Sequence, residues 1–141
     1  MEGRFPFGKL PKYPHMKPED VAVWERFIAQ NPRYFVTCDY DVPVGTGAPT
    51  NPEHPENIQA DHKILTQKKI DVVGYSTTGN YVVEVKPVAD MKALGQILVY
   101  RKLYLADNPN LPLVHCMVVC GSVERELGEL FAEHDIMVEV A

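Results

Sequence analysis

The sequence has few of the features that mark secreted or membrane proteins. It contains only three cysteines, Cys38, Cys116 and Cys120, and no two of them form a CxxC pair. This argues against a disulfide framework and predicts buried, reduced thiols. No apolar run approaches the length of a membrane span, and no signal-peptide pattern opens the chain. We therefore expect a cytoplasmic protein, in the host cytoplasm if the source is viral, with no membrane partner.

The sequence also lacks the excess of positive charge that is typical of proteins that bind nucleic acids. The formal net charge is -5, which by itself argues against such a partner. The charge is unevenly distributed, however. Residues 63–102 carry seven basic and three acidic residues, whereas residues 103–141 carry one basic and seven acidic residues. We interpret the acidic end as solvated surface, which leaves a basic middle segment.

What is present fits one globular domain. The 141 residues are 45% apolar and 23% charged, which suffices for a hydrophobic core. Residues 1–17 predict an extended N-terminal arm, and residues 18–141 predict a single domain with no internal repeat. The arm mixes basic and aromatic residues, which suits contact with nucleic acid or a second subunit, although packing on its own domain is the more ordinary alternative.

Hydrophobic periodicity predicts alternating helices and strands within that domain. The expected elements are a helix at 18–30, a strand at 34–44, a loop at 45–62, a hairpin at 68–75 and 81–87, a helix at 89–106, a strand at 113–120, a helix from Ser122 and a strand at 136–140. This order predicts an α/β fold, with a mixed sheet that has helices on both faces.

Three polar residues interrupt the otherwise apolar hairpin. Glu84 and Lys86 share one face of their strand, because side chains alternate along a strand. A turn centred on Thr78-Gly79 places Asp71 opposite Lys86 and diagonal to Glu84, within about 8 Å. A slip of one residue would move Asp71 to the other face. The hairpin is therefore expected to gather two carboxylates and an ammonium group.

Two carboxylates this close together resist ionising at the same time unless a cation is bound between them. Hard oxygen ligands that leave room for water and phosphate suit Mg²⁺ or Mn²⁺. Such a metal lowers the pKa of its bound water and neutralises charge on a phosphate, which equips the site to hydrolyse a phosphodiester. The alternative is a surface Glu-Lys pair with an unrelated aspartate on a half-exposed strand.

The combined pattern resembles the PD-(D/E)xK superfamily of restriction-endonuclease-like nucleases. The matching residues are Asp71, Glu84-Val85-Lys86 and the following helix "GQILVYRKLY", whose Gln96 and Tyr100 are similar to the QxxxY element of the RecB-like branch. Ile70 stands where the superfamily's name has proline. The resemblance implies an αβββαβ core, here with an extra C-terminal helix and strand.

The resemblance also implies roles for these residues. Asp71, Glu84 and the backbone carbonyl of Val85 would bind the metal, and Lys86 would orient or activate the attacking water. Gln96 and Tyr100, which share a helix face, would line the site and touch substrate or structural water.

More candidates lie outside these motifs. Many relatives add an acid from the first helix, for which Glu25 is the candidate, with a solvated glutamate as the alternative. Three basic residues of the next helix are candidates to contact phosphates, with simple surface solvation as the alternative. They are Lys92, Arg101 and Lys102.

The sequence therefore predicts an Mg²⁺- or Mn²⁺-dependent deoxyribonuclease that acts in DNA repair, recombination or phage DNA metabolism. Its partner would be DNA, and a homodimer or a larger assembly is compatible with cutting two strands. The first alternative is a catalytically inactive binding or structural module that keeps the nuclease fold. The second is an interaction protein with an unrelated α/β fold.

Overall fold

Six strands form one mixed sheet in which the spatial order of the strands is the same as their order in the chain. The computed structural model describes residues 3–141. The strands are β1 (Phe5–Pro6), β2 (Thr37–Val44), β3 (Lys68–Ser76), β4 (Gly79–Ala89), β5 (Val114–Val123) and β6 (Ile136–Val140). Neighbours from β1 to β4 are antiparallel, whereas β4–β5 and β5–β6 are parallel.

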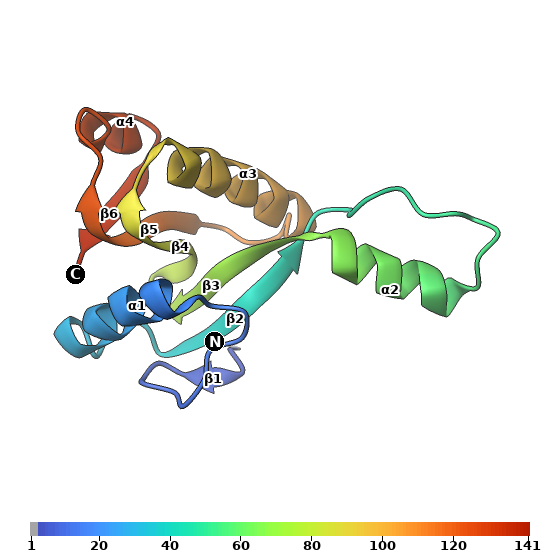
Figure 1. Ribbon diagram of the computed structural model, residues 1–141, viewed down its shortest axis with the longest axis horizontal. Coiled ribbons are helices and arrows are strands. Elements are labelled where there is room, and N and C mark those ends of the chain that lie inside the picture. The colour runs from blue at the N-terminus through green and yellow to red at the C-terminus, as the bar shows by residue number, and fades with distance from the viewer. Residues whose placement is uncertain (1–2) are drawn as a thin grey trace.

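Helices cover both faces of this sheet (Figure 1). The helices are α1 (Pro18–Gln30), α2 (Glu56–Thr66), α3 (Met91–Asp107) and α4 (Gly128–Glu133). Helices α1 and α3 pack on opposite faces of the sheet, whereas α2 packs on neither. The elements α1, β2, β3, β4, α3 and β5 give the expected αβββαβ core, and α4 and β6 are the extra C-terminal helix and strand. The predicted fold class is confirmed. None of the helices within residues 3–141 is long and apolar enough to cross a membrane.

Two apolar layers, one on each face, hold the helices to the sheet. The layer under α1 contains Trp24 and Phe27 of the helix with Val72 and Val83 of the sheet. The layer under α3 contains a separate set of helix and sheet residues, including Ile97. Because these side chains are buried on both faces, the central strands read as nearly continuous apolar runs.

Helix ends are set by local residues. Pro18 occupies the first turn of α1, where its missing N–H group is not needed. The Asp90 carboxylate accepts a hydrogen bond of 2.8 Å from Ala93 N–H and so caps the start of α3. This cap fixes the path by which the chain leaves β4 and enters α3.

The sequence predicted a loop over residues 45–62, and this prediction was wrong in part. Residues 56–66 form the helix α2. This helix buries none of its residues, so it lacks the stripe of core-facing side chains that predicts a helix. It is held instead by local polar contacts, such as the 2.8 Å hydrogen bond from Ala48 N–H to Thr66 Oγ1. In Figure 1, α2 and its preceding loop project away from the sheet.

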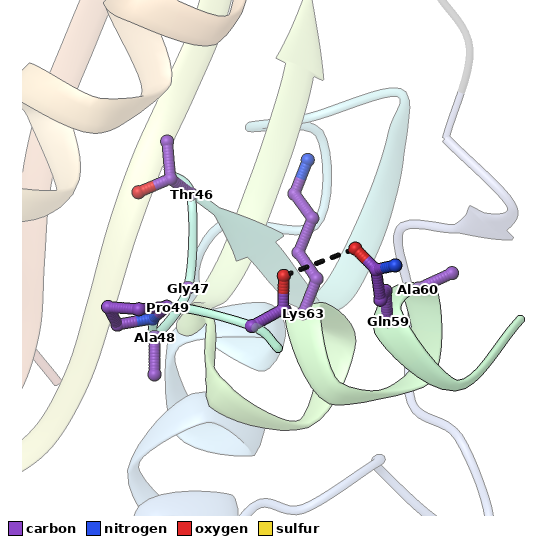
Figure 2. Close-up of a pocket in the computed structure, with 8 residues that line it drawn as sticks. Thr46, Gly47, Ala48, Pro49, Gln59, Ala60 and Lys63 are labelled. Carbon is purple, nitrogen blue, oxygen red and sulfur yellow. Dashed lines mark hydrogen bonds between the residues drawn. The ribbon is translucent and has the colours of Figure 1, made fainter. Parts of the chain in front are cut away.

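A hollow lies between α2 and the preceding loop. Figure 2 shows its lining, which consists of Thr46, Gly47, Ala48, Pro49, Thr50, Gln59, Ala60 and Lys63. A hydrogen bond of 3.4 Å joins Thr50 and Gln59 across it. None of the predicted site residues lines this hollow.

The helix predicted from Ser122 is also wrong in its position. Strand β5 continues through Val123, because Val88 and Ala89 of β4 extend far enough to pair with Ser122 and Val123. Helix α4 therefore begins only at Gly128. In the N-terminal arm, Phe5 pairs with Cys38 of β2, so this part of the arm packs on its own domain.

Candidate active site

The β3–β4 hairpin brings the two predicted acids next to each other. Its ladder runs from the pair Ser76–Gly79 to the pair Val72–Val83, so the turn is Thr77-Thr78. The predicted turn centre was wrong by one residue, which moves the register by two positions. Because a shift of two keeps every side chain on its face, Asp71 still shares a face with the predicted partners, but its position now aligns with Glu84 rather than Lys86.

The Asp71 carboxylate is held in place by the backbone of β4. Its Oδ2 accepts a hydrogen bond of 2.9 Å from Val85 N–H. A side-chain oxygen thus accepts a hydrogen bond that a backbone carbonyl accepts in a regular ladder. Burial raises the pKa of Asp71, and the hydrogen bond from Val85 opposes that rise. Asp71 is thus directed toward β4 and toward Glu84.

Glu84 is buried without a full set of hydrogen-bond partners. It is 3% exposed, and among the described residues it is the one buried charged-type side chain. Its Oε2 has no hydrogen-bond partner in the protein. Burial, and then the negative charge of Asp71, raise the pKa of Glu84 to about 9. Without a bound metal ion, Glu84 therefore holds a proton at neutral pH.

Two residues of α3 face this acid pair. Burial, followed by the negative charges of Glu84 and Asp71, raises the pKa of Tyr100 to about 12, so its hydroxyl group stays protonated. Gln96 lies one turn earlier on the same helix face, and its Oε1 is a second buried oxygen without a partner. The structure therefore places Tyr100 near the acids, with Gln96 beside Tyr100 on the same helix.

Lys86 lies near the acid pair, where its positive charge opposes the rise in the pKa of both Asp71 and Glu84. Its Nζ is 3.8 Å from Asp90 Oδ1, and its side chain is 20% exposed. The hydrogen bond from Ala93 N–H is the main cause that lowers the pKa of Asp90, and Lys86 adds to it. The sequence analysis did not predict Asp90 as a site residue. An aspartate just before a helix is typical of a helix cap, and its place four residues after Lys86 is compatible with an ion pair.

The acid that α1 brings near the pair is Asp20 rather than Glu25. The Tyr13 hydroxyl donates a hydrogen bond of 3.2 Å to Glu25 Oε2, so Glu25 faces the N-terminal arm. The charge of Asp20, in contrast, raises the pKa of both Asp71 and Glu84. Burial, and then neighbouring Glu19, raise the pKa of Asp20 itself. The first turn of α1, rather than its middle, reaches the site.

The basic residues of α3 divide into two kinds. Arg101 Nη1 donates a hydrogen bond of 2.6 Å to the carbonyl of His134, which ties α3 to the end of α4. Lys92 and Lys102 are exposed. Their contact with phosphate groups stays a prediction, and the structure leaves Arg101 less free for it.

The oxygen donors suit a hard divalent cation that keeps part of its water. Within residues 3–141, no three His, Cys, Asp or Glu side chains converge as a complete metal-binding group. Mg²⁺, however, is often bound by only one or two carboxylates and retains several waters. Asp71 and Glu84 supply such a pair, and the unpartnered Glu84 Oε2 and Gln96 Oε1 are oxygens that a cation or its water would satisfy.

Comparison with known proteins supports the fold. No family model matches the sequence, and no curated protein matches it. Among solved structures, the chain is similar to a repair endonuclease from Pyrococcus abyssi, with a TM-score of 0.53 and 17% sequence identity. The match covers 92% of this chain and 49% of that one, so this chain spans about half the length of the endonuclease. The similarity shows a nuclease-like fold.

Proposed function

We propose that the protein is a divalent-metal-dependent nuclease that hydrolyses phosphodiester bonds in DNA. The observation that carries this proposal is the buried Glu84 carboxyl, whose Oε2 has no partner, next to Asp71. Burying a carboxyl oxygen without a hydrogen-bond partner has a free-energy cost, and the charge of Lys86 opposes the resulting rise in the pKa of Glu84 only in part. A cation bound between the two acids would offset it, and the nuclease-like fold is consistent with that use.

In this proposal Asp71, Glu84 and the Val85 carbonyl would hold Mg²⁺ or Mn²⁺, and the nearby carboxylate of Asp20 would assist. When bound, the metal supplies an activated water molecule and neutralises charge on the phosphate. Asp20 replaces Glu25 as the acid contributed by α1, because it is the one whose charge acts on the pair.

The side chains around the acids would position the reacting groups. Lys86, restrained by Asp90, would donate a hydrogen bond to the attacking water or to a phosphate oxygen. The water oxygen would bond to phosphorus as the bond from phosphorus to the 3′ oxygen breaks. The proton lost by the water would pass to solvent, and the leaving 3′ oxygen would take a proton from solvent to become a hydroxyl group. Tyr100 and Gln96 would donate hydrogen bonds to the phosphate or to an ordered water.

DNA is proposed as the substrate because the site lies within the basic segment 63–102. The exposed Lys92 and Lys102 would bind backbone phosphates, which is a salt-sensitive and sequence-independent interaction. We place the protein in the cytoplasm, with a role in repair, recombination or phage DNA metabolism. Its three cysteines are buried and unpaired, which is consistent with a reducing compartment. A homodimer would supply two sites for cutting two strands.

The test is to incubate linear, circular, branched and single-stranded DNA with the protein in Mg²⁺, in Mn²⁺ and in chelator. We expect cleavage that requires the metal and that is abolished in Asp71→Ala, Glu84→Ala and Lys86→Ala, each of which keeps its fold by circular dichroism. Arg125→Ala, at an exposed basic residue outside the segment 63–102, is the control and should cleave normally.

Two results would contradict the proposal. Full activity in the three alanine variants would remove these residues from the reaction. Absence of cleavage, together with no heat of Mn²⁺ binding in a calorimetric titration, would favour an inactive nuclease-fold module.

A further inference from the structure

The ladder between β2 and β3 is interrupted at one position beside the acid pair. Thr37 pairs with Tyr75 at one end and Val44 with Lys68 at the other, and the register is the same throughout. Only Asp41 and Asp71, which would face each other in that register, are unpaired. Because the register does not change across the gap, no residue has been inserted, and the interruption is not a β-bulge.

Both strands turn over at this gap. On β3, Val72 packs in the layer under α1, whereas Ile70 packs in the layer under α3. On β2, Tyr40 packs under α1, whereas Val42 packs under α3. Residues two apart on a regular strand share one face, so the alternation is broken once in each strand, and at the same pair.

The conformation of Asp41 accounts for the break. Its φ angle is 53°, in the left-handed region that a regular strand does not use. Aspartate tolerates this region better than most residues, and a β-branched residue tolerates it least. His15 of the arm also has a positive φ, 54°, and its Nε2 lies 3.5 Å from Asp41 Oδ2.

The break determines where the Asp71 side chain goes. In a regular strand, Asp71 would share the layer under α3 with Val73, because residues two apart face the same side. At the turn-over point its carboxylate is instead directed at the neighbouring strand β4, where it accepts the hydrogen bond from Val85 N–H. Backbone strain held by surrounding structure is common at functional sites.

We propose that Asp41 is a positioning residue. Its left-handed backbone turns over β2 and β3 together and thereby directs the Asp71 carboxylate toward β4 and the metal site. The part of this inference that concerns metal rests on the proposed function, whereas the part that concerns the orientation of Asp71 does not.

Three substitutions separate the backbone of Asp41 from its carboxylate. Asp41→Gly and Asp41→Val both remove the carboxylate and its contact with His15, but glycine accepts a positive φ and valine does not. Asp41→Asn keeps the tolerance for positive φ and removes only the charge. Each variant is titrated with Mn²⁺ by calorimetry, and the ¹³C resonance of the Asp71 carboxyl is followed by NMR in the metal-free protein.

We expect Asp41→Gly and Asp41→Asn to retain Mn²⁺ affinity and the wild-type Asp71 resonance. Asp41→Val should bind Mn²⁺ about tenfold more weakly or worse, and its Asp71 resonance should move, because a β-branched residue resists the left-handed conformation. If the valine variant does not fold, Asp41→Ala provides a milder change in the same direction.

Two outcomes would overturn the inference. One is a folded valine or alanine variant that matches the wild type in both measurements. The other is a glycine variant as impaired as the valine variant, which would assign the effect to the carboxylate. If the wild-type protein itself binds no Mn²⁺, the proposed function fails, and the Asp71 resonance still decides the role of Asp41.

Discussion

The acid pair of the hairpin is largely buried, whereas the helix α2 that leads into the hairpin is exposed. Glu84 is 3% exposed, whereas Leu65 of α2 is 79% exposed. An exposed leucine is ordinary, since more than half of a typical protein surface is apolar. A buried carboxyl oxygen without a partner is rare and has a free-energy cost. The buried carboxyl of Glu84 therefore supports a functional site, whereas the exposed leucine of α2 does not.

The largest expected effect on stability comes from comparing a buried isoleucine of the hairpin with an exposed isoleucine of α2. Ile70, next to Asp71, is 0% exposed, and Ile64 of α2 is 53% exposed. Ile70→Ala should lower the free energy of unfolding by about 2–5 kcal/mol, because it leaves a cavity in the core. Ile64→Ala should change it by less than about 0.5 kcal/mol. Urea unfolding of both variants measures the difference, and equal effects would show that α2 is packed in solution.

The next effect concerns the cost of burying Glu84. Its folded pKa of about 9 lies above the ordinary 4.5, so between these values the folded state binds more protons than the unfolded state. The free energy of unfolding therefore falls as pH rises through this interval. Glu84→Gln removes that loss and should be more stable than the wild type at pH 7, by on the order of 3 kcal/mol in chelator.

Thermal unfolding in chelator from pH 4 to pH 9 measures this effect. The advantage of Glu84→Gln should vanish near pH 4 and grow with pH. Added Mg²⁺ should stabilise the wild type and leave the variant unchanged. A glutamine variant that is less stable than the wild type at pH 8 in chelator would contradict the burial cost assigned to Glu84.

The smallest effect separates two roles of Asp90. Asp90→Ala removes both the cap of α3 and the charge near Lys86, whereas Asp90→Ser keeps a capping oxygen and removes only the charge. The alanine variant should lose about 1 kcal/mol of stability and the serine variant much less. Both should cleave DNA more slowly, because Lys86 is less restrained. Normal cleavage by the serine variant would show that Asp90 acts only as a cap.

The core of the fold could be predicted because its apolar patterns are strong. The stripe that contains Trp24 and Phe27 indicated α1, and the valine runs indicated the central strands. Helix α2 could not be predicted in this way, because it is held by local polar contacts such as the hydrogen bond from Ala48 N–H to Thr66 Oγ1. Patterns of burial carry no information about an element that buries nothing.

The turn of the hairpin shows how an error in the predicted turn position can leave the prediction of the site correct. Gly79 suggested a turn one residue later than the real one. In the structure, Ser76 Oγ accepts a hydrogen bond from Thr78 N–H and donates one to the Gly79 carbonyl, which closes the turn over Thr77-Thr78. The resulting register error was even, so the prediction that Asp71 and Glu84 come together did not depend on it.

The remaining site residues depend on distances between elements, which a single sequence does not reveal. Helical spacing gave the face of α1 that packs on the sheet, but not which of its turns lies near β3. Glu25 was therefore predicted as the acid that α1 contributes to the site. In the structure, the charge of Asp20 is the one that acts on Glu84. The interruption at Asp41 was likewise invisible, because an alternating pattern was assumed throughout β2.

The sequential order of the strands has a consequence for how the molecule folds. Each strand pairs with the one before it in the chain, so the sheet can grow by successive addition, and the loop closed between Asp71 and Glu84 is short. Loop-closure entropy is low for such contacts, and they form early. We therefore expect the two acids to meet while water still surrounds them, so that the desolvation cost of Glu84 arises only when α3 packs over the hairpin.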